Sequence, residues 1–69
     1  MNTTEKTQSL RMLTKAAREN DPAISVRVEK GKFDVCRVTY PSGSTANVQS
    51  LTGFCSLDEA VEYLEWVAQ

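Results

Sequence analysis

The sequence predicts a small α+β domain, built in the order helix, three strands, helix. Three observations predict it: an amphipathic pattern over residues 4–20, two alternating apolar segments joined by a short turn, and a second amphipathic pattern from Leu57 onwards. The connections between the three strands are too short for a crossover, which predicts an antiparallel three-stranded meander. We expect both helices on one face of the sheet and one compact domain over residues 1–69.

The first helix is predicted over residues 4–20. Asn2 with Glu5, or Thr3 or Thr4 alone, can cap its start, and Asn20-Asp21-Pro22 ends it because the residue before proline avoids helical dihedral angles. Its predicted apolar face is made of Leu10, Met12, Leu13, Ala16 and Ala17. Its opposite side carries Arg11, Lys15 and Arg18.

Three strands are predicted between the helices. Residues 24–29 alternate apolar and polar side chains, Lys30-Gly31 is typical of a tight turn, and residues 33–40 return as a second strand. A second turn is predicted at 41–44, followed by a weaker strand over 45–51 with Ala46 and Val48 on one face.

The second strand is apolar on both sides. A two-residue turn at Lys30-Gly31 would set Val28 opposite Phe33 and Val26 opposite Val35, facing the core. Three residues would then point away from the helices: Cys36, Val38 and Tyr40. A bulge near Cys36-Arg37, or burial on both faces, would enclose them. The alternative is an exposed apolar patch beside Thr45, Asn47 and Gln49, which would indicate a contact surface.

The last helix begins with a capping box, Ser56-Leu57-Asp58-Glu59. Its predicted apolar face is made of Leu57, Ala60, Val61, Leu64, Val67 and Ala68. Trp66 lies about opposite Leu57 on a helical wheel, outside that face, with Tyr63 at its edge. A tryptophan beside glutamates is typical of an interface anchor with a polar rim, although packing at the edge of the core is the alternative.

The composition argues against a catalytic function. The chain has no histidine, so no serine or cysteine has the usual base beside it. Cys36 and Cys55 lack metal-site spacing, no phosphate-binding glycine loop occurs, and we expect no catalytic residue, metal or cofactor. With no apolar run long enough for a membrane span and no signal segment, we expect a cytoplasmic protein with free thiols; a disulfide is the alternative.

The element order resembles that of the double-stranded RNA-binding domain. That family binds phosphates through a lysine-rich start of its second helix and a histidine-containing loop between its first two strands. Here the second helix starts with Asp58 and Glu59, and the turn is Glu29-Lys30-Gly31-Lys32. The resemblance therefore concerns topology, and no functional residue is transferred.

The function we expect is a non-enzymatic protein-binding module, an inhibitor or regulator of the kind that phages and mobile elements use against host defence. The predicted contact residues are Trp66, Tyr63, Glu62, Glu65, Val38 and Tyr40. The alternative is nucleic-acid binding through Arg11, Lys15, Arg18, Lys30 and Lys32. Because all 8 basic residues precede the acidic last helix, pairing of opposite helices in a homodimer is a further alternative.

Overall fold

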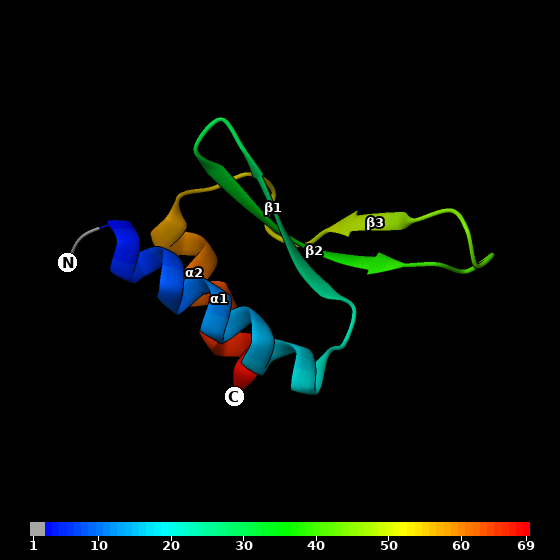
Figure 1. The fold of residues 1–69 in the computed structure, drawn as a ribbon, viewed down its shortest axis with the longest axis horizontal. Coiled ribbons are helices and arrows are strands. Elements are labelled where there is room, and N and C mark those ends of the chain that lie inside the picture. Colours follow the sequence, from blue (N-terminus) through cyan, green and yellow to red (C-terminus); the bar gives the residue numbers. More distant parts are fainter. Residues whose placement is uncertain (1–2) are drawn as a thin grey trace.

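The computed structural model describes the backbone of residues 3–69 and the side chains of residues 8–69. Its elements are α1 (Thr3–Asn20), β1 (Ile24–Glu29), β2 (Lys32–Thr39), β3 (Asn47–Ser50) and α2 (Leu57–Ala68). The strand order is β1-β2-β3 and both pairings are antiparallel. Figure 1 shows the two helices side by side against the sheet, which confirms the predicted α+β architecture.

A two-residue turn sets the register of β1 and β2. Lys30 has φ 51° and Gly31 φ 75°, and this pair of positive values is what a type I′ hairpin turn requires. Val28 consequently lies opposite Phe33, and Val26 opposite Val35, as the sequence predicts. The side chains of these four residues therefore share the sheet face that meets the helices.

The core lies between that face and the two helices. Six buried side chains form its centre: Leu10, Ala17, Ile24, Val35, Ala60 and Leu64. The helices run in the same direction, and the Asn20 amide at the end of α1 donates to the carbonyls of Val67, at 2.8 Å, and Gln69, at 3.1 Å. This side chain supplies donors to carbonyls that the end of a helix leaves unpaired.

Two positions correct the predicted core. Met12 is 73% exposed, whereas Thr14 is buried and its hydroxyl donates to the Leu10 carbonyl at 2.7 Å. Among the described side chains of α1, the buried ones are Leu10, Thr14 and Ala17. The covered face of α1 is therefore centred on a different part of the helix surface from the predicted apolar face. Val28 is 63% exposed, because β1 diverges from α1 as it approaches the turn (Figure 1).

The capping box of α2 is confirmed. The Glu59 N–H donates to Ser56 Oγ at 3.2 Å, and the Ser56 N–H donates to Glu59 Oε1 at 3.3 Å. The caps predicted for α1, Asn2 with Glu5, Thr3 or Thr4, lie outside the described side chains.

The outer face of the sheet has no bulge between β1 and β2. Their pairing is unbroken from Glu29–Lys32 to Ile24–Arg37, so Cys36 points away from the helices and is nevertheless fully buried. Both Cys36 and Cys55 are free thiols, as expected.

An apolar patch does occur on the outer face, further along the β2–β3 hairpin. Val38 lies directly opposite Val48, which is 43% exposed, and Tyr40 is 60% exposed. Two of the three predicted neighbours of this patch were wrong, because Asn47 and Gln49 alternate with Val48 and point to the other face. This hairpin extends beyond the helices (Figure 1) and every residue of β3 is exposed.

Among the described residues, neither α1 nor α2 combines the length and the apolar character that crossing a lipid bilayer requires.

The turn residue Lys30 provides a test of the register. Because asparagine tolerates positive φ better than lysine, Lys30→Asn should raise the free energy of unfolding by about 0.5 kcal/mol. Urea denaturation measures this change. Lys32→Asn is the matched control, since Lys32 is an exposed strand residue where asparagine is disfavoured. Equal stabilisation by both substitutions would contradict the turn.

Candidate functional site

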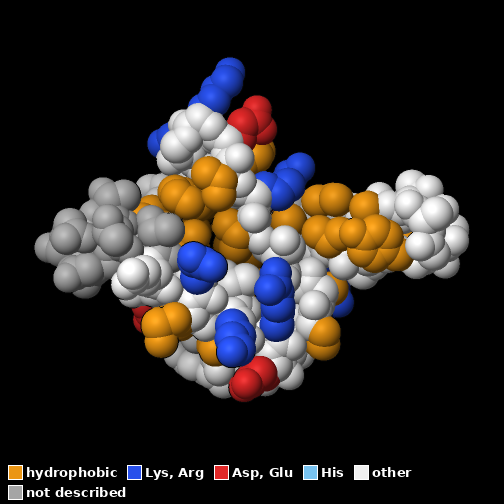
Figure 2. All heavy atoms as spheres, viewed as in Figure 1, with side chains coloured by type: hydrophobic (Ala, Val, Ile, Leu, Met, Phe, Trp, Pro, Cys, Tyr) orange, Lys and Arg blue, Asp and Glu red, His pale blue; other side chains and the backbone are white. Residues whose placement is uncertain are grey.

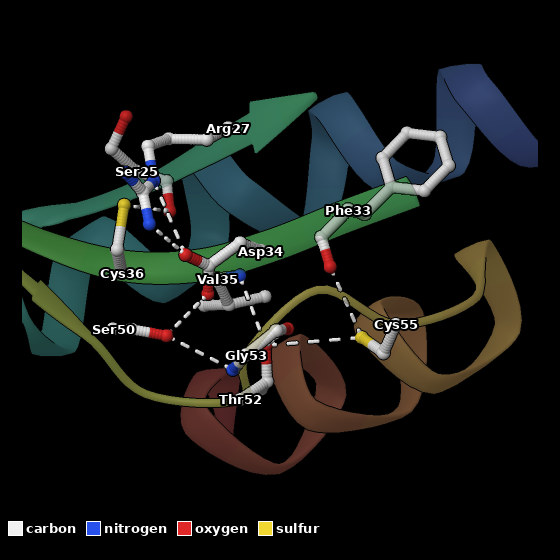
Figure 3. Close-up of polar contacts among 10 residues, drawn as sticks. All are labelled: Ser25, Arg27, Phe33, Asp34, Val35, Cys36, Ser50, Thr52, Gly53 and Cys55. Carbon is white, nitrogen blue, oxygen red and sulfur yellow. Dashed lines mark hydrogen bonds and ion pairs between the residues drawn. The ribbon is translucent and has the colours of Figure 1, made fainter. Parts of the chain in front are cut away.

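A buried carboxylate lies on the outer face of the sheet. Asp34 is fully buried, and its Oδ2 accepts hydrogen bonds from Arg27 Nε, at 3.2 Å, and from Arg27 Nη2 in an ion pair. Its Oδ1 accepts from the Ser50 hydroxyl at 2.7 Å. The other side of Arg27 faces Phe54, whose ring centroid is 5.3 Å from the guanidinium carbon. Asp34 thus joins β1, β2 and the end of β3 (Figure 3).

These contacts determine the charge of Asp34. Burial by itself raises the pKa of a carboxyl group. The hydrogen bonds from Arg27 and Ser50, the positive charge of Arg27 and the backbone N–H of Gly53 outweigh burial, so the pKa of Asp34 is lowered below its usual value. Asp34 is therefore a stable anion and a weak base.

The cluster also holds the segment that leads to α2. The Gly53 N–H donates to Ser50 Oγ at 3.0 Å, and the Val35 N–H donates to Thr52 Oγ1 at 3.1 Å (Figure 3). Beyond this segment, Cys55 exchanges two backbone hydrogen bonds with Phe33, at 2.9 and 2.8 Å. The Asp34 cluster therefore has a structural role, because it connects the sheet to the segment that leads to α2.

The thiol of Cys36 lies next to this cluster and is poorly suited to nucleophilic attack. Burial raises its pKa, the charge of Asp34 raises it further, and Arg27 opposes both effects only in part. A nucleophilic cysteine needs a lowered pKa. The described residues also contain no group of three or more carboxylates and cysteines that could hold a metal ion.

The main candidate for a binding site is a groove beside α2, with a volume of about 520 Å³. Its lining residues are Leu51, Thr52, Cys55, Glu59, Glu62, Tyr63 and Trp66. Trp66 is 66% exposed, and its ring centroid lies 5.7 Å from that of Tyr63 at an interplanar angle of 49°. We refer to these seven residues as the α2 groove.

The structure brings together only half of the predicted contact residues. Trp66, Tyr63 and Glu62 line the α2 groove. Glu65 borders a different groove, between the two helices, with Met12. The other two predicted contact residues, Val38 and Tyr40 on the β2–β3 hairpin, line neither groove.

The residues predicted to bind nucleic acid are also divided. Arg11 and Arg18 border a third groove between α1 and β1, whereas Lys15 is exposed outside it. Lys30 lies in the hairpin turn and Lys32 directly after it. Figure 2 shows lysine and arginine side chains spread over the face that α1 and β1 form.

Sequence reasoning missed several members of the α2 groove, namely Leu51, Thr52 and Cys55. They belong to the segment after β3, which has no helical or strand period, and the Asp34 cluster positions them. A charged residue between Phe33 and Val35 in an apolar strand was the available signal of that cluster.

Comparisons with protein-family models, with curated proteins and with solved structures find no match to this chain.

The lowered pKa of Asp34 makes a stability prediction. A group with a lowered folded-state pKa stabilises the fold above its unfolded value, about 3.9 for aspartate, and this contribution is lost as the pH falls through the folded value. At pH 7, Asp34→Asn should lower the free energy of unfolding by about 1–3 kcal/mol. The difference from the unmodified protein should shrink as the pH falls below about 4.

Urea denaturation over a pH series measures this difference. Asp21→Asn is the control, because it removes the half-exposed Asp21–Arg37 pair (3.0 Å) and should cost less than about 1 kcal/mol at pH 7. A loss for Asp34→Asn that is constant down to the lowest pH would contradict the role of the charge.

Proposed function

We propose that this chain is a non-enzymatic protein-binding module that uses the α2 groove. The observation that carries the proposal is the exposed indole of Trp66 beside Tyr63, in a groove with two glutamates on its rim. Tryptophan and tyrosine are, with arginine, the residues most enriched among those that dominate binding energy at protein interfaces.

The indole is supported by its neighbours before any partner arrives. The Tyr63 ring contacts it in a tilted arrangement at 5.7 Å, which restricts the orientations open to Trp66. An anchor that is already ordered loses less conformational entropy on binding. The groove beside it, open to solvent, could receive an apolar side chain of the partner.

The charge of the rim indicates the kind of partner. Glu59 and Glu62 are exposed, and they lie one helical turn before Tyr63 and Trp66 respectively. One Glu59 oxygen already accepts from the Ser56 N–H and hydroxyl. A partner surface with an apolar pocket surrounded by lysine or arginine would complement this arrangement.

Occupation of such a partner surface is the action of an inhibitor or regulator. A phage or mobile-element protein directed against host defence is the specific version of this proposal, and it rests on the small size of the domain. A second copy of the chain is the competing partner, with the basic side of α1 meeting the acidic side of α2.

Trp66→Ala tests the proposal. The substitution should change the free energy of unfolding by no more than about 1 kcal/mol, because Trp66 is mostly exposed and contributes mainly its contact with Tyr63. It should also abolish the capture of a partner from the native host. Affinity capture followed by quantitative mass spectrometry measures this loss. The matched control is Met12→Ala, which removes a similarly exposed apolar side chain from the other helix.

Binding to the captured protein is then measured with both components purified. Trp66 is the only tryptophan, so its fluorescence should shift to shorter wavelength when the partner covers it. Capture that survives Trp66→Ala, or that is lost equally with Met12→Ala, would refute the use of the α2 groove. Sedimentation of the chain alone distinguishes a second copy from a different protein.

Nucleic-acid binding is the competing function, supported by the exposed basic side chains of α1 (Figure 2). It predicts that the chain retards a short RNA or DNA duplex in a gel at low salt. It also predicts that Arg11→Glu with Lys15→Glu abolishes the retardation, since phosphate contacts dominate such binding. No retardation by the unmodified protein at low salt would exclude this function.

A further inference from the structure

The outer edge of β1 carries backbone groups that no other strand uses. The sheet order leaves β1 with β2 as its only neighbour. On the far side of β2, Phe33 exchanges both of its hydrogen bonds with Cys55, and the Val35 carbonyl accepts from Leu51 at 2.8 Å. Phe33 and Val35 therefore direct their N–H and C=O groups away from β1.

The register between β1 and β2 determines which backbone groups of β1 point away from β2. Val28 lies opposite Phe33, and Val26 lies opposite Val35. In an antiparallel pair, opposite residues either bond to one another or both point outward. The N–H and C=O groups of Val26 and Val28 consequently point to the open edge of the sheet.

This open edge has a defined end. At Ile24 the N–H donates to the Asp21 carbonyl at 3.1 Å, and the carbonyl accepts from Arg18 Nε at 2.8 Å. Ile24 is therefore unavailable, and the open edge consists of Val26 and Val28, whose four backbone N–H and C=O groups bond to none of the residues that the structure describes. An edge of this length suits a short extended segment.

A groove of about 370 Å³ runs beside the open edge, between β1 and α1. Its floor includes Val26, Val28 and Phe33, and Val28 is 63% exposed. Arg11 and Arg18 border it from the helix. Arg11 forms no ion pair with any side chain that the structure describes.

We propose that this edge binds an extended, acidic segment of a partner protein, which adds to the sheet as a fourth strand beside β1. The segment exchanges backbone hydrogen bonds with Val26 and Val28. On the face of the added strand that meets the helices, an apolar side chain covers Val28 and a carboxylate faces Arg11 and Arg18. The site is separate from the α2 groove, because that groove is lined by residues 51–55, which lie on the side of β2 away from β1. The proposal therefore neither requires nor replaces the function proposed above.

Charge argues against a second copy at this edge. If two β1 strands paired antiparallel with Val26 opposite Val28, Arg27 would lie opposite Arg27 of the other copy. The arginines of both α1 helices would also be brought to one interface. An acidic strand has neither conflict. The apolar floor and the unused backbone groups fit a peptide better than the phosphates of a nucleic acid.

The probe is a short synthetic peptide, blocked at both ends, in which every second residue is threonine. The residues between the threonines are valine and glutamate in turn, so that valine and glutamate side chains lie on the same face of the extended peptide. Two control peptides replace glutamate with lysine, or the central valine with proline. Amide hydrogen exchange on the labelled protein should show new protection at Val26 and Val28 with the glutamate peptide only. The proline peptide lacks a donor in the middle of the strand and should fail to protect them.

Val28→Pro removes one outward N–H and leaves the bonds between β1 and β2 intact, a placement that edge strands tolerate. It should weaken binding of the glutamate peptide about tenfold, the equivalent of a lost hydrogen bond to a bound strand. Val28→Thr keeps the N–H and should retain the affinity within about twofold. Arg11→Glu, an exposed change, should weaken binding about tenfold and serves as the deciding variant if Val28→Pro does not fold.

Three results would overturn the proposal. The first is no protection by the glutamate peptide, or equal protection by the lysine peptide. The second is a short RNA duplex that binds with an affinity sensitive to Arg11→Glu and indifferent to Val28→Pro, which would assign the edge to nucleic acid. The third is a dimer in sedimentation that Val28→Pro dissociates, which would assign the edge to a second copy.

Discussion

The carboxylate of Asp34 lies in the middle of the outer sheet face and accepts hydrogen bonds from β1 and from the end of β3. β3 is short and wholly exposed, so little apolar burial holds it or the segment that follows it. The hydrogen bonds of Asp34 and Ser50 to their neighbours, including Gly53, supply that attachment instead. They position the chain for the Cys55–Phe33 pairing and for the cap of α2. Because the charge of Asp34 is buried, its pairing with Arg27 is necessary for the cluster to be stable.

The same cluster positions the candidate binding surface. The residues after β3 form one wall of the α2 groove, and the face of α2 around Trp66 forms the other. Trp66 is exposed because Ala60 and Leu64, on the opposite side of the helix, are the residues that enter the core. A rigid scaffold thus presents an ordered aromatic pair with acidic neighbours. This surface and the arginine-bordered groove lie at opposite edges of the sheet, so one edge carries glutamates and the other carries arginines.

Several elements follow from local pattern because local physics determines them. The capping box at Ser56 satisfies helix N–H groups within one turn, and the Lys30-Gly31 turn sets the register with residues adjacent in sequence. The burial of Thr14 in place of Met12 does not follow from pattern. The hydrophobicity of the helix specifies an apolar arc about its axis, whereas the angle at which α1 meets both β1 and α2 decides which part of that arc is covered.

The sequence by itself determined the order of the elements, the antiparallel pairing with the Val28–Phe33 register, and the position of Trp66 outside the apolar face of α2. These depend on interactions within a few residues. Tertiary structure alone decided that Cys36 and Asp34 are buried on the outer face, that Val48 lies opposite Val38, and that the predicted contact residues divide between separate grooves. Each of these depends on groups distant in sequence, such as Ser50, which bonds to Asp34 from the end of β3. Their encounter is set by how the sheet and helices pack, which no local period records.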